Sequence, residues 1–147
     1  MTVGRKKKDK TFEKILEFER RIFDCTHRCT KGELKRLYDF RELLFINDFG
    51  YTLAAPLETV KKNELPKEEY KHHGCKDTLY IYSIGLVPEA RGRGLGKKML
   101  NEVIENSTKS RISLNTKNKI MKQMCLDFGF EQLSETYFIL DKNKKKN

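Results

Sequence analysis

The sequence predicts one α/β domain in which helices flank a mixed sheet. The chain has 147 residues, enough for one compact domain with a core and too few for two ordinary ones. Several segments carry apolar residues at helical spacing, and short apolar runs typical of strands stand between them. From residue 78 onward strand and helix alternate, which is an order typical of α/β domains.

Two helices are expected at the start of the chain. Apolar residues form one helical stripe from Phe12 to Phe23, and this helix should end near Asp24. Thr30 is followed three residues later by Glu33, a capping-box spacing that opens a second short helix.

A hairpin and a polar segment should follow these helices. The apolar runs 43–46 and 51–55 are separated by a polar, glycine-ending turn at 47–50, which indicates strand, turn and strand. Residues 58–77 are polar and predict an exposed loop, and such long connections are often functional.

The strongest strand of the sequence covers residues 78–87 and ends at Pro88, which has no N–H for a ladder. It is apolar on both faces, so we expect it at the centre of the sheet. A helix, a strand, a helix and a last strand are expected after it, over residues 95–104, 111–115, 120–128 and 137–140. The last strand offers an edge through which two copies of the chain can pair as a homodimer.

The net charge of +10 is concentrated at the two ends of the chain. Eight lysines lie in the terminal runs, and such runs are usually solvated tails. We therefore divide the chain into a basic tail at 1–10, a folded domain at 11–141 and a basic tail at 142–147. No basic helix interleaved with aromatic residues is visible, which argues against nucleic acid as the partner.

Nothing in the sequence has the length of a membrane-spanning helix or the apolar core of a secretory signal. A protein of the cytoplasm is the expectation, with the nucleus as an alternative, and without a membrane partner.

The cysteines and histidines do not form a complete metal motif. Cys25 and Cys29 with His72, His73 and Cys75 supply soft ligands, yet their spacing fits no common zinc module. We therefore predict no metal and expect Cys25 and Cys29 to act as small apolar residues, with a structural zinc as the alternative.

The segment after Pro88 has a direct use in binding an anion. Gly92, Gly94 and Gly96 remove side chains, so that backbone N–H groups can approach an anion, and a helix N-terminus follows. Formal positive charge comes from the basic residues among them, which are Arg91, Arg93, Lys97 and Lys98. A pyrophosphate suits this arrangement.

Two other phosphate motifs are excluded by spacing. A dinucleotide fingerprint needs a third glycine three residues after the second, and that position is Lys97. A P-loop needs four residues between its glycines and then Gly-Lys-Ser/Thr, which is absent.

In this glycine-rich segment the sequence resembles the GNAT superfamily of N-acetyltransferases. The family's Gln/Arg-x-x-Gly-x-Gly/Ala signature is matched by Arg91-x-x-Gly94-x-Gly96. A second element, Asn118 followed by a helix and Gly129-Phe130, is similar to the family's Asn…Gly-Phe element. The likeness covers Tyr80 to Phe130.

This resemblance implies a GNAT-like, mostly antiparallel sheet and acetyl-CoA as co-substrate. It implies that backbone amides of residues 91–96 hold the pyrophosphate and that Leu86 and Val87 pair with the pantetheine arm. A splay of strands beside residues 84–86 would present an N–H to the thioester oxygen. The implied cofactor-binding residues are Ile84, Leu86, Val87, Arg91, Gly92, Arg93, Gly94, Leu95, Gly96, Lys97 and Asn118.

The chain departs from the family in two places. The family's usual acid, a tyrosine four residues before the glycine of Gly-Phe, is replaced by Cys125. We expect Cys125 near the thioester sulfur, as proton donor, as nucleophile or as a buried packing residue. No strand is evident before the first helix.

The acceptor side is harder to predict. By alternation Tyr80, Tyr82 and Ile84 share one face of the central strand, which makes Tyr82 a candidate to position the amine or relay a proton, with core packing as the alternative. His72 and His73 are further candidate bases. Glu89, which lies beside the glycine-rich turn, is read as a solvated rim carboxylate.

The predicted function is transfer of an acetyl group from acetyl-CoA to a primary amine of a small molecule or a protein. An aminosugar phosphate such as glucosamine 6-phosphate is one acceptor, and a protein or peptide amine is the alternative. A non-catalytic acyl-CoA sensor and a basic nucleic-acid-associated protein are the other hypotheses.

Overall fold

The computed structural model describes residues 9–23, 31–60 and 77–143. Its six strands form one sheet in the order β1-β2-β3-β4-β6-β5. β3 and β4 pair in parallel, and the other neighbouring strands pair antiparallel. The strands are β1 Leu43–Ile46, β2 Gly50–Pro56, β3 Thr78–Leu86, β4 Arg111–Asn115, β5 Glu131–Gln132 and β6 Tyr137–Asp141. The predicted mixed, mostly antiparallel sheet with a central strand at 78–87 is confirmed.

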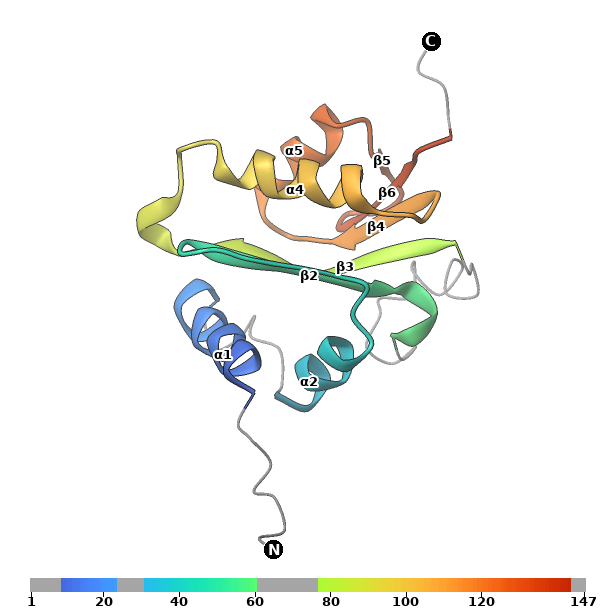
Figure 1. Cartoon of the computed structure of the whole chain (residues 1–147). Coiled ribbons are helices and arrows are strands. Elements are labelled where there is room, and N and C mark those ends of the chain that lie inside the picture. The colour runs from blue at the N-terminus through green and yellow to red at the C-terminus, as the bar shows by residue number, and fades with distance from the viewer. Residues whose placement is uncertain (1–8, 24–30, 61–76, 144–147) are drawn as a thin grey trace, which may run out of the picture.

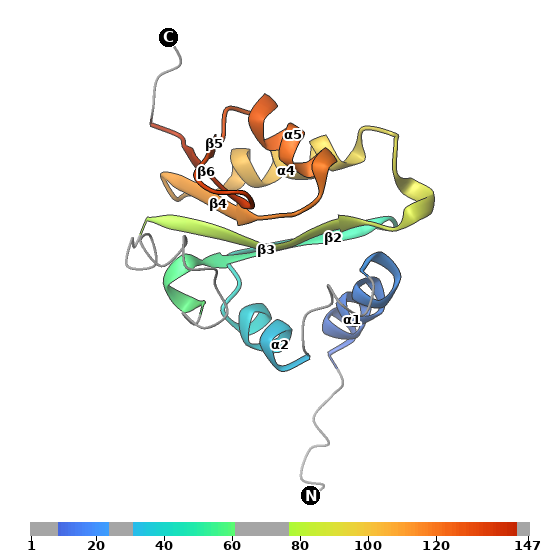
Figure 2. The ribbon, with the colours of Figure 1, turned by 180° about the vertical axis from the view of Figure 1, so that it is seen from behind.

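Helices cover both faces of this sheet (Figure 1). α1 and α2 lie on one face and α4 and α5 on the other, as the view from behind also shows (Figure 2). The helices are α1 Lys10–Ile22, α2 Lys31–Asp39, α4 Leu95–Asn106 and α5 Lys119–Asp127, with short 3-10 turns at Leu57–Thr59 and Pro88–Ala90. Only Asp9 is described before α1, so whether a strand precedes this helix stays a prediction.

The two helical layers bury two separate apolar cores against the sheet. The α1/α2 core includes Ile15, Leu34, Leu37, Tyr51 and Leu53. The α4/α5 core includes Leu100, Val103, Ile112, Leu114 and Phe138. The amphipathic stripes predicted for the helices are therefore the faces that bury these residues.

The described residues begin at Asp9, directly before α1. Asp9 caps α1 by accepting hydrogen bonds from the N–H groups of Thr11 and Phe12, and the Phe12 bond is the main cause of a lowered pKa for this carboxyl. Thr30, the first residue of the predicted capping box, lies outside the described residues. So do nearly all of the predicted tails 1–10 and 142–147, whose boundaries remain a prediction.

Part of the edge expected to serve a homodimer is occupied within the chain. β5 pairs with β6 opposite Phe138 and Ile139. A second copy pairing along β6 would therefore meet β5 over those residues.

A β-bulge interrupts the pairing of β2 with β3. Leu53 lies opposite Ser83 and Ala54 lies opposite Ile81, so Tyr82 is an extra residue of β3. The Tyr51 hydroxyl donates a hydrogen bond to Ser83 Oγ at 2.8 Å, and both side chains are buried on the α1/α2 side. Tyr82 packs against the same core, so two successive side chains of β3 face one layer.

The bulge corrects one expectation from the sequence. Tyr80 and Tyr82 do share the α1/α2 face, but Ile84 packs in the core on the α4/α5 side. Simple alternation placed all three on one face, and the inserted residue at the bulge inverts the pattern for Ile84.

We predict that the bulge depends on the buried hydrogen bond between Tyr51 and Ser83. Tyr51→Phe or Ser83→Ala should each lower the free energy of unfolding by about 1–3 kcal/mol, because each leaves a buried hydroxyl without this partner. The double variant should lose less than the sum of the two, as measured by urea denaturation. Strict additivity would show that the two hydroxyls do not interact.

Candidate functional site

β3 extends beyond the end of its pairing with β4. Their parallel pairing runs from Thr78 opposite Arg111 to Ile81 opposite Leu114 and goes no further. β3 continues to Leu86 while paired only with β2. Residues 82–86 of β3 therefore have an edge that β4 does not cover.

The backbone groups that point to this uncovered edge follow from one hydrogen bond. The N–H of Val87 donates to the carbonyl of Phe49, on the β2 side, at 2.8 Å. Because backbone groups alternate along a strand, the groups of Ile84 and Leu86 point away from β2, toward the gap left by β4. In agreement, the Leu86 carbonyl accepts a hydrogen bond from Arg91 Nε at 3.2 Å rather than one from β2. The N–H groups of Ile84 and Leu86 are thus the donors along this edge.

Val87 does not share this role. Its N–H is bonded to Phe49, and its carbonyl accepts a hydrogen bond from the N–H of Ala90 at 3.0 Å. Its side chain is buried as well. Of the two residues expected to pair with a pantetheine arm, Leu86 keeps a suitable N–H, as Ile84 does, and Val87 has both backbone groups engaged in the chain.

The turn that follows brings the start of α4 beside the end of β3. Gly92 and Gly94 have φ of 83° and 76°, the left-handed region that glycine adopts without strain. Gly94 is the N-cap of α4 and can offer no capping side chain, whereas Asp9 caps α1 and Asn118 caps α5. The N–H groups of the first turn of α4 therefore face outward as donors, with the positive end of the helix dipole behind them.

The space over these glycines is open. A Cβ added at Gly92 or Gly94 would meet no atom of the described residues within 4 Å. Arg93, Lys97 and Lys98 are exposed around the turn and add positive charge. This part of the site can hold an anion, because backbone donors, a helix N-terminus and cations converge on space that side chains leave empty.

Arg91 has a different task from its basic neighbours. Its Nη2 donates to the carbonyl of Ile22, the last residue of α1, at 3.3 Å, while its Nε donates to Leu86. Arg21 of α1 also forms an ion pair with Glu89. The Arg91 side chain thus joins the end of α1, the end of β3 and the glycine-rich turn.

The remaining predicted contacts lie around the start of α4. A Cβ at Gly96 would come within 3.1 Å of Met124 Cε, so this glycine lets α4 approach α5 closely. Leu95 is half-buried against the α1/α2 core. Asn118 is exposed, and its Oδ1 accepts the N–H of Met121 at 3.0 Å, so a ligand contact would fall to its side-chain amide nitrogen.

Cys125 lies in the α4/α5 core. Its side chain is fully buried in a cluster that includes Leu100, Phe130 and Phe138. Burial raises the pKa of the thiol to about 12, because the charged thiolate would lose its hydration. At neutral pH Cys125 is a neutral thiol, and this disfavours the nucleophilic role considered from the sequence.

Tyr82 is half-buried on the opposite face of the sheet from α4, at the bulge itself. Its hydroxyl donates a hydrogen bond to Glu33 Oε2 of α2 at 3.1 Å. The sequence singled out Tyr82, but it assigned Glu33 only a capping role. No local pattern could have joined the two, because 49 positions separate them.

The histidines and most of the cysteines considered as bases or metal ligands are not described by the structure. The candidate metal ligands and bases that lie outside the described residues are Cys25, Cys29, His72, His73 and Cys75. Within residues 9–23, 31–60 and 77–143 no three acidic, histidine or cysteine side chains gather as a metal site. No helix in these ranges has the length and apolarity needed to cross a membrane.

Comparison with known proteins agrees with this geometry. Residues 49–130 match the Acetyltransferase (GNAT) family, and this match includes β3, the glycine-rich turn, α4 and α5. The chain therefore belongs to the GNAT acetyltransferase family. No curated protein sequence matches the chain.

Solved structures share the fold at low sequence identity. A GNAT family acetyltransferase from Brucella melitensis, in complex with acetyl-CoA, has a TM-score of 0.60 at 13% identity over 97% of this chain and 89% of its own. The Escherichia coli N-acetyltransferase YhbS, in complex with CoA, has a TM-score of 0.58 at 14% identity over 89% and 76%. GphF, a GNAT-like decarboxylase in complex with isobutyryl-CoA, has a TM-score of 0.60 at 12% identity over 88% and 93%.

We predict that Cys125 is unreactive in the folded protein. With a pKa of about 12, it is ionised to only about one part in ten thousand at pH 8, and its sulfur is covered. Alkylation with iodoacetamide at pH 8, mapped by mass spectrometry, should label Cys125 after denaturation and not before. Labelling of native Cys125 at the rate of a free thiol would contradict its burial.

Proposed function

We propose that the protein is an acetyl-CoA-dependent N-acetyltransferase that transfers the acetyl group to a primary amine. The observation that carries this proposal is the junction of two features, the uncovered edge of β3 at Ile84 and Leu86 and the uncapped start of α4. Both lie within the part of the chain that matches the family. Together they suit a ligand with a carbonyl at one end and a pyrophosphate further along.

The donor end of the site fits an acyl-CoA. The pyrophosphate would lie on the backbone N–H groups that follow Gly92 and Gly94, in the space where a Cβ meets no atom of the described chain. Arg93, Lys97 and Lys98 would complement its charge and that of the further phosphate. The three similar structures were each solved with CoA, acetyl-CoA or isobutyryl-CoA, which supports the same class of ligand here.

The chemistry follows from the uncovered strand edge. An N–H of Ile84 or Leu86 would hydrogen-bond the thioester oxygen and stabilise the negative charge that develops when an amine attacks. The amine would arrive from the α1/α2 face, where Tyr82 projects at the bulge and can position it. Cys125 is proposed as a packing residue, since the coenzyme A thiolate is itself a tolerable leaving group.

The fold alone does not choose this reaction, because the decarboxylase GphF shares it. The family match supports acyl transfer. For the acceptor we propose a primary amine of a small molecule, such as an aminosugar phosphate like glucosamine 6-phosphate, or an amine of a protein or peptide. The cytoplasm is the proposed compartment.

A variant of the turn tests cofactor binding. Gly94→Ala should lower the affinity for acetyl-CoA by about tenfold or more, because the added methyl enters the open space and strains a residue with φ of 76° by about 1–2 kcal/mol. Gly32→Ala is the matched control. It lies within α2, where a Cβ also meets no described atom, and should stabilise the helix by up to about 1 kcal/mol with affinity unchanged. Isothermal titration calorimetry with acetyl-CoA gives both values, and equal affinities for the two variants would contradict the proposed cradle.

A panel of amines tests the reaction itself. Release of free coenzyme A, followed with a thiol reagent, should depend on both acetyl-CoA and one of the amines. The panel contains glucosamine 6-phosphate, polyamines, arylalkylamines and lysine and N-terminal peptides, and mass spectrometry should show an added acetyl group on the amine. Tight binding of acetyl-CoA without turnover of any amine would favour a sensor instead.

A further inference from the structure

The contact between α2 and β3 at the bulge joins a phenol to a carboxylate. The Tyr82 hydroxyl donates a hydrogen bond to Glu33 Oε2 at 3.1 Å, and both side chains are half-buried. With its proton directed at Glu33, the phenol oxygen turns its lone pairs away from the carboxylate. Such an oxygen can accept an N–H from a third group.

The position of this pair within the sheet indicates which third group that is. Tyr82 is the first residue of β3 past the end of its pairing with β4. Its side chain lies on the α1/α2 face, whereas α4 and the uncapped helix start lie against the other face (Figures 1 and 2). An amine that reaches the gap from the α1/α2 side would meet Tyr82 beside the donors of Ile84 and Leu86.

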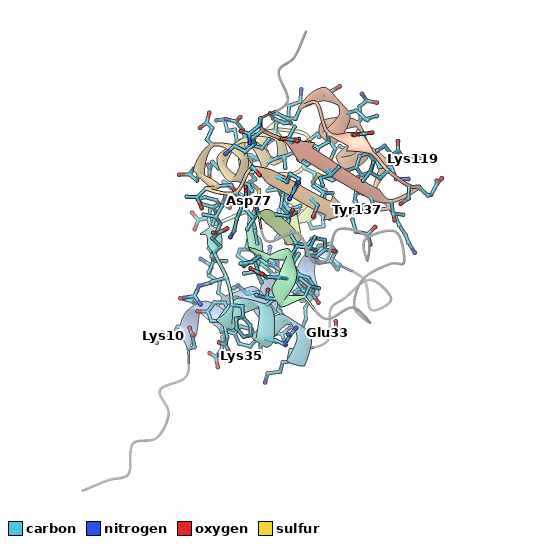
Figure 3. The ribbon with its side chains drawn as sticks, turned by 90° about the vertical axis from the view of Figure 1, so that its right-hand side faces the viewer. Lys10, Glu33, Lys35, Asp77, Lys119 and Tyr137 are labelled. Atoms are coloured by element: carbon cyan, nitrogen blue, oxygen red, sulfur yellow. The ribbon has the colours of Figure 1, made fainter. Side chains whose placement is uncertain are left out.

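Figure 3 views the side of the molecule on which Glu33 lies in the α1/α2 layer and Lys119 lies in the α4/α5 layer. Glu33 is in the first turn of α2 and its carboxylate reaches the sheet. A carboxylate on this face complements a positively charged ammonium, while the cations of the glycine-rich turn complement phosphate.

We propose that Glu33, acting through Tyr82, is the proton acceptor for the acceptor amine. This inference rests on the proposed N-acetyltransferase function and supplies the base that the sequence did not identify. Tyr82 is the catalytic residue in contact with the amine. Glu33 holds the phenol in position and takes its proton.

The proposed reaction moves two protons from the substrate nitrogen. The phenol oxygen of Tyr82 accepts one proton from the substrate ammonium as its own proton passes to Glu33, which leaves a neutral amine, an unchanged phenol and a protonated carboxyl. The amine nitrogen forms a bond to the carbonyl carbon of the thioester, and the carbon–sulfur bond breaks. A second nitrogen proton ends on the coenzyme A sulfur, and Glu33 then releases its proton to solvent.

A similar pair elsewhere in the same layer provides a control. The hydroxyl of Tyr38 donates to Asp9 Oδ2 at 2.9 Å, so it is also a tyrosine hydrogen-bonded to a carboxylate. Tyr38 faces the start of α1 and has no part in the proposed site. Tyr38→Phe therefore reports what the loss of such a bond does through the fold alone.

The experiment compares Glu33→Gln, Glu33→Asp, Tyr82→Phe, the double variant Glu33→Gln/Tyr82→Phe and Tyr38→Phe. For each full-length protein we would measure the melting temperature, the Kd for acetyl-CoA by calorimetry, and kcat and KM for the best amine of the panel. Tyr82→Phe keeps the ring and the charge, so it tests the proposal even if Glu33→Gln does not fold.

The expected result is a loss in kcat that is not shared by cofactor binding. Glu33→Gln and Tyr82→Phe should each lower kcat by about 100-fold, the range of general base catalysis, with the Kd for acetyl-CoA within about twofold of wild type. The double variant should be no slower than either single variant, because both act in one proton path. Glu33→Asp should recover part of the loss, and Tyr38→Phe should keep the wild-type kcat.

Two results would overturn the inference and are distinguishable. If the wild type acetylates an amine and Glu33→Gln keeps its kcat, or if the two single losses multiply in the double variant, Glu33 is not the proton acceptor. If the wild type binds acetyl-CoA and acetylates no amine, the proposed function fails and this inference fails with it.

Discussion

The end of the pairing between β3 and β4 is the constraint on which the proposed site depends. Parallel pairing holds the two strands together as far as Ile81 and Leu114, one residue before β4 itself ends, and the bulge residue Tyr82 is the next residue of β3. An extra residue increases the local twist of a strand, and here it stands where the pairing with β4 stops. The hydrogen bond between Tyr51 and Ser83 lies in the α1/α2 core, where an unpaired hydroxyl is costly. The bulge residue Tyr82 therefore both packs against this core and begins the part of β3 that is not paired with β4.

The turn after β3 is fixed to the opposite layer rather than to the helix it precedes. Helix ends leave carbonyl groups without intrahelical partners, and Arg91 satisfies one of them at Ile22 while it also binds the carbonyl of Leu86. With the ion pair of Arg21 and Glu89, this connects α1 to the residues that lead into α4. The first position of the family signature, Arg91, is a structural link here, and in the proposed site the backbone N–H groups and the other basic residues would bind the anion.

Most of the elements could be predicted from the sequence because they depend on local patterns. The periodicity of α1 and α5, the apolar run of β3 and the glycines before α4 are all readable within a few residues. The bulge could not be predicted in this way, because it is set by the register between Leu53 and Ser83 on separate strands. That single insertion is why alternation placed Ile84 on the wrong face.

The hydrogen bond between Glu33 and Tyr82 could not be predicted from the sequence for a similar reason. In the sequence Glu33 completes a capping spacing with Thr30, which is a sufficient local explanation for its presence. Its contact with β3 arises only when α2 packs on the sheet. For Val87 the family resemblance predicted a contact with the pantetheine arm. In the structure both of its backbone groups are hydrogen-bonded within the chain.

The two faces of the sheet differ in the charge they present to a ligand. The start of α4 offers backbone donors and cations, whereas the α1/α2 face at the bulge offers a phenol and a carboxylate. An intact sheet would keep an anionic and a cationic ligand apart, so a reaction between them needs an opening through it. In the proposed function the two ligands meet at the part of β3 beyond Ile81, which is not paired with β4 and along which the N–H groups of Ile84 and Leu86 lie. An enzyme with a different reaction shares this fold. The residues along the uncovered edge of β3, rather than the rest of the fold, must therefore determine which chemistry occurs.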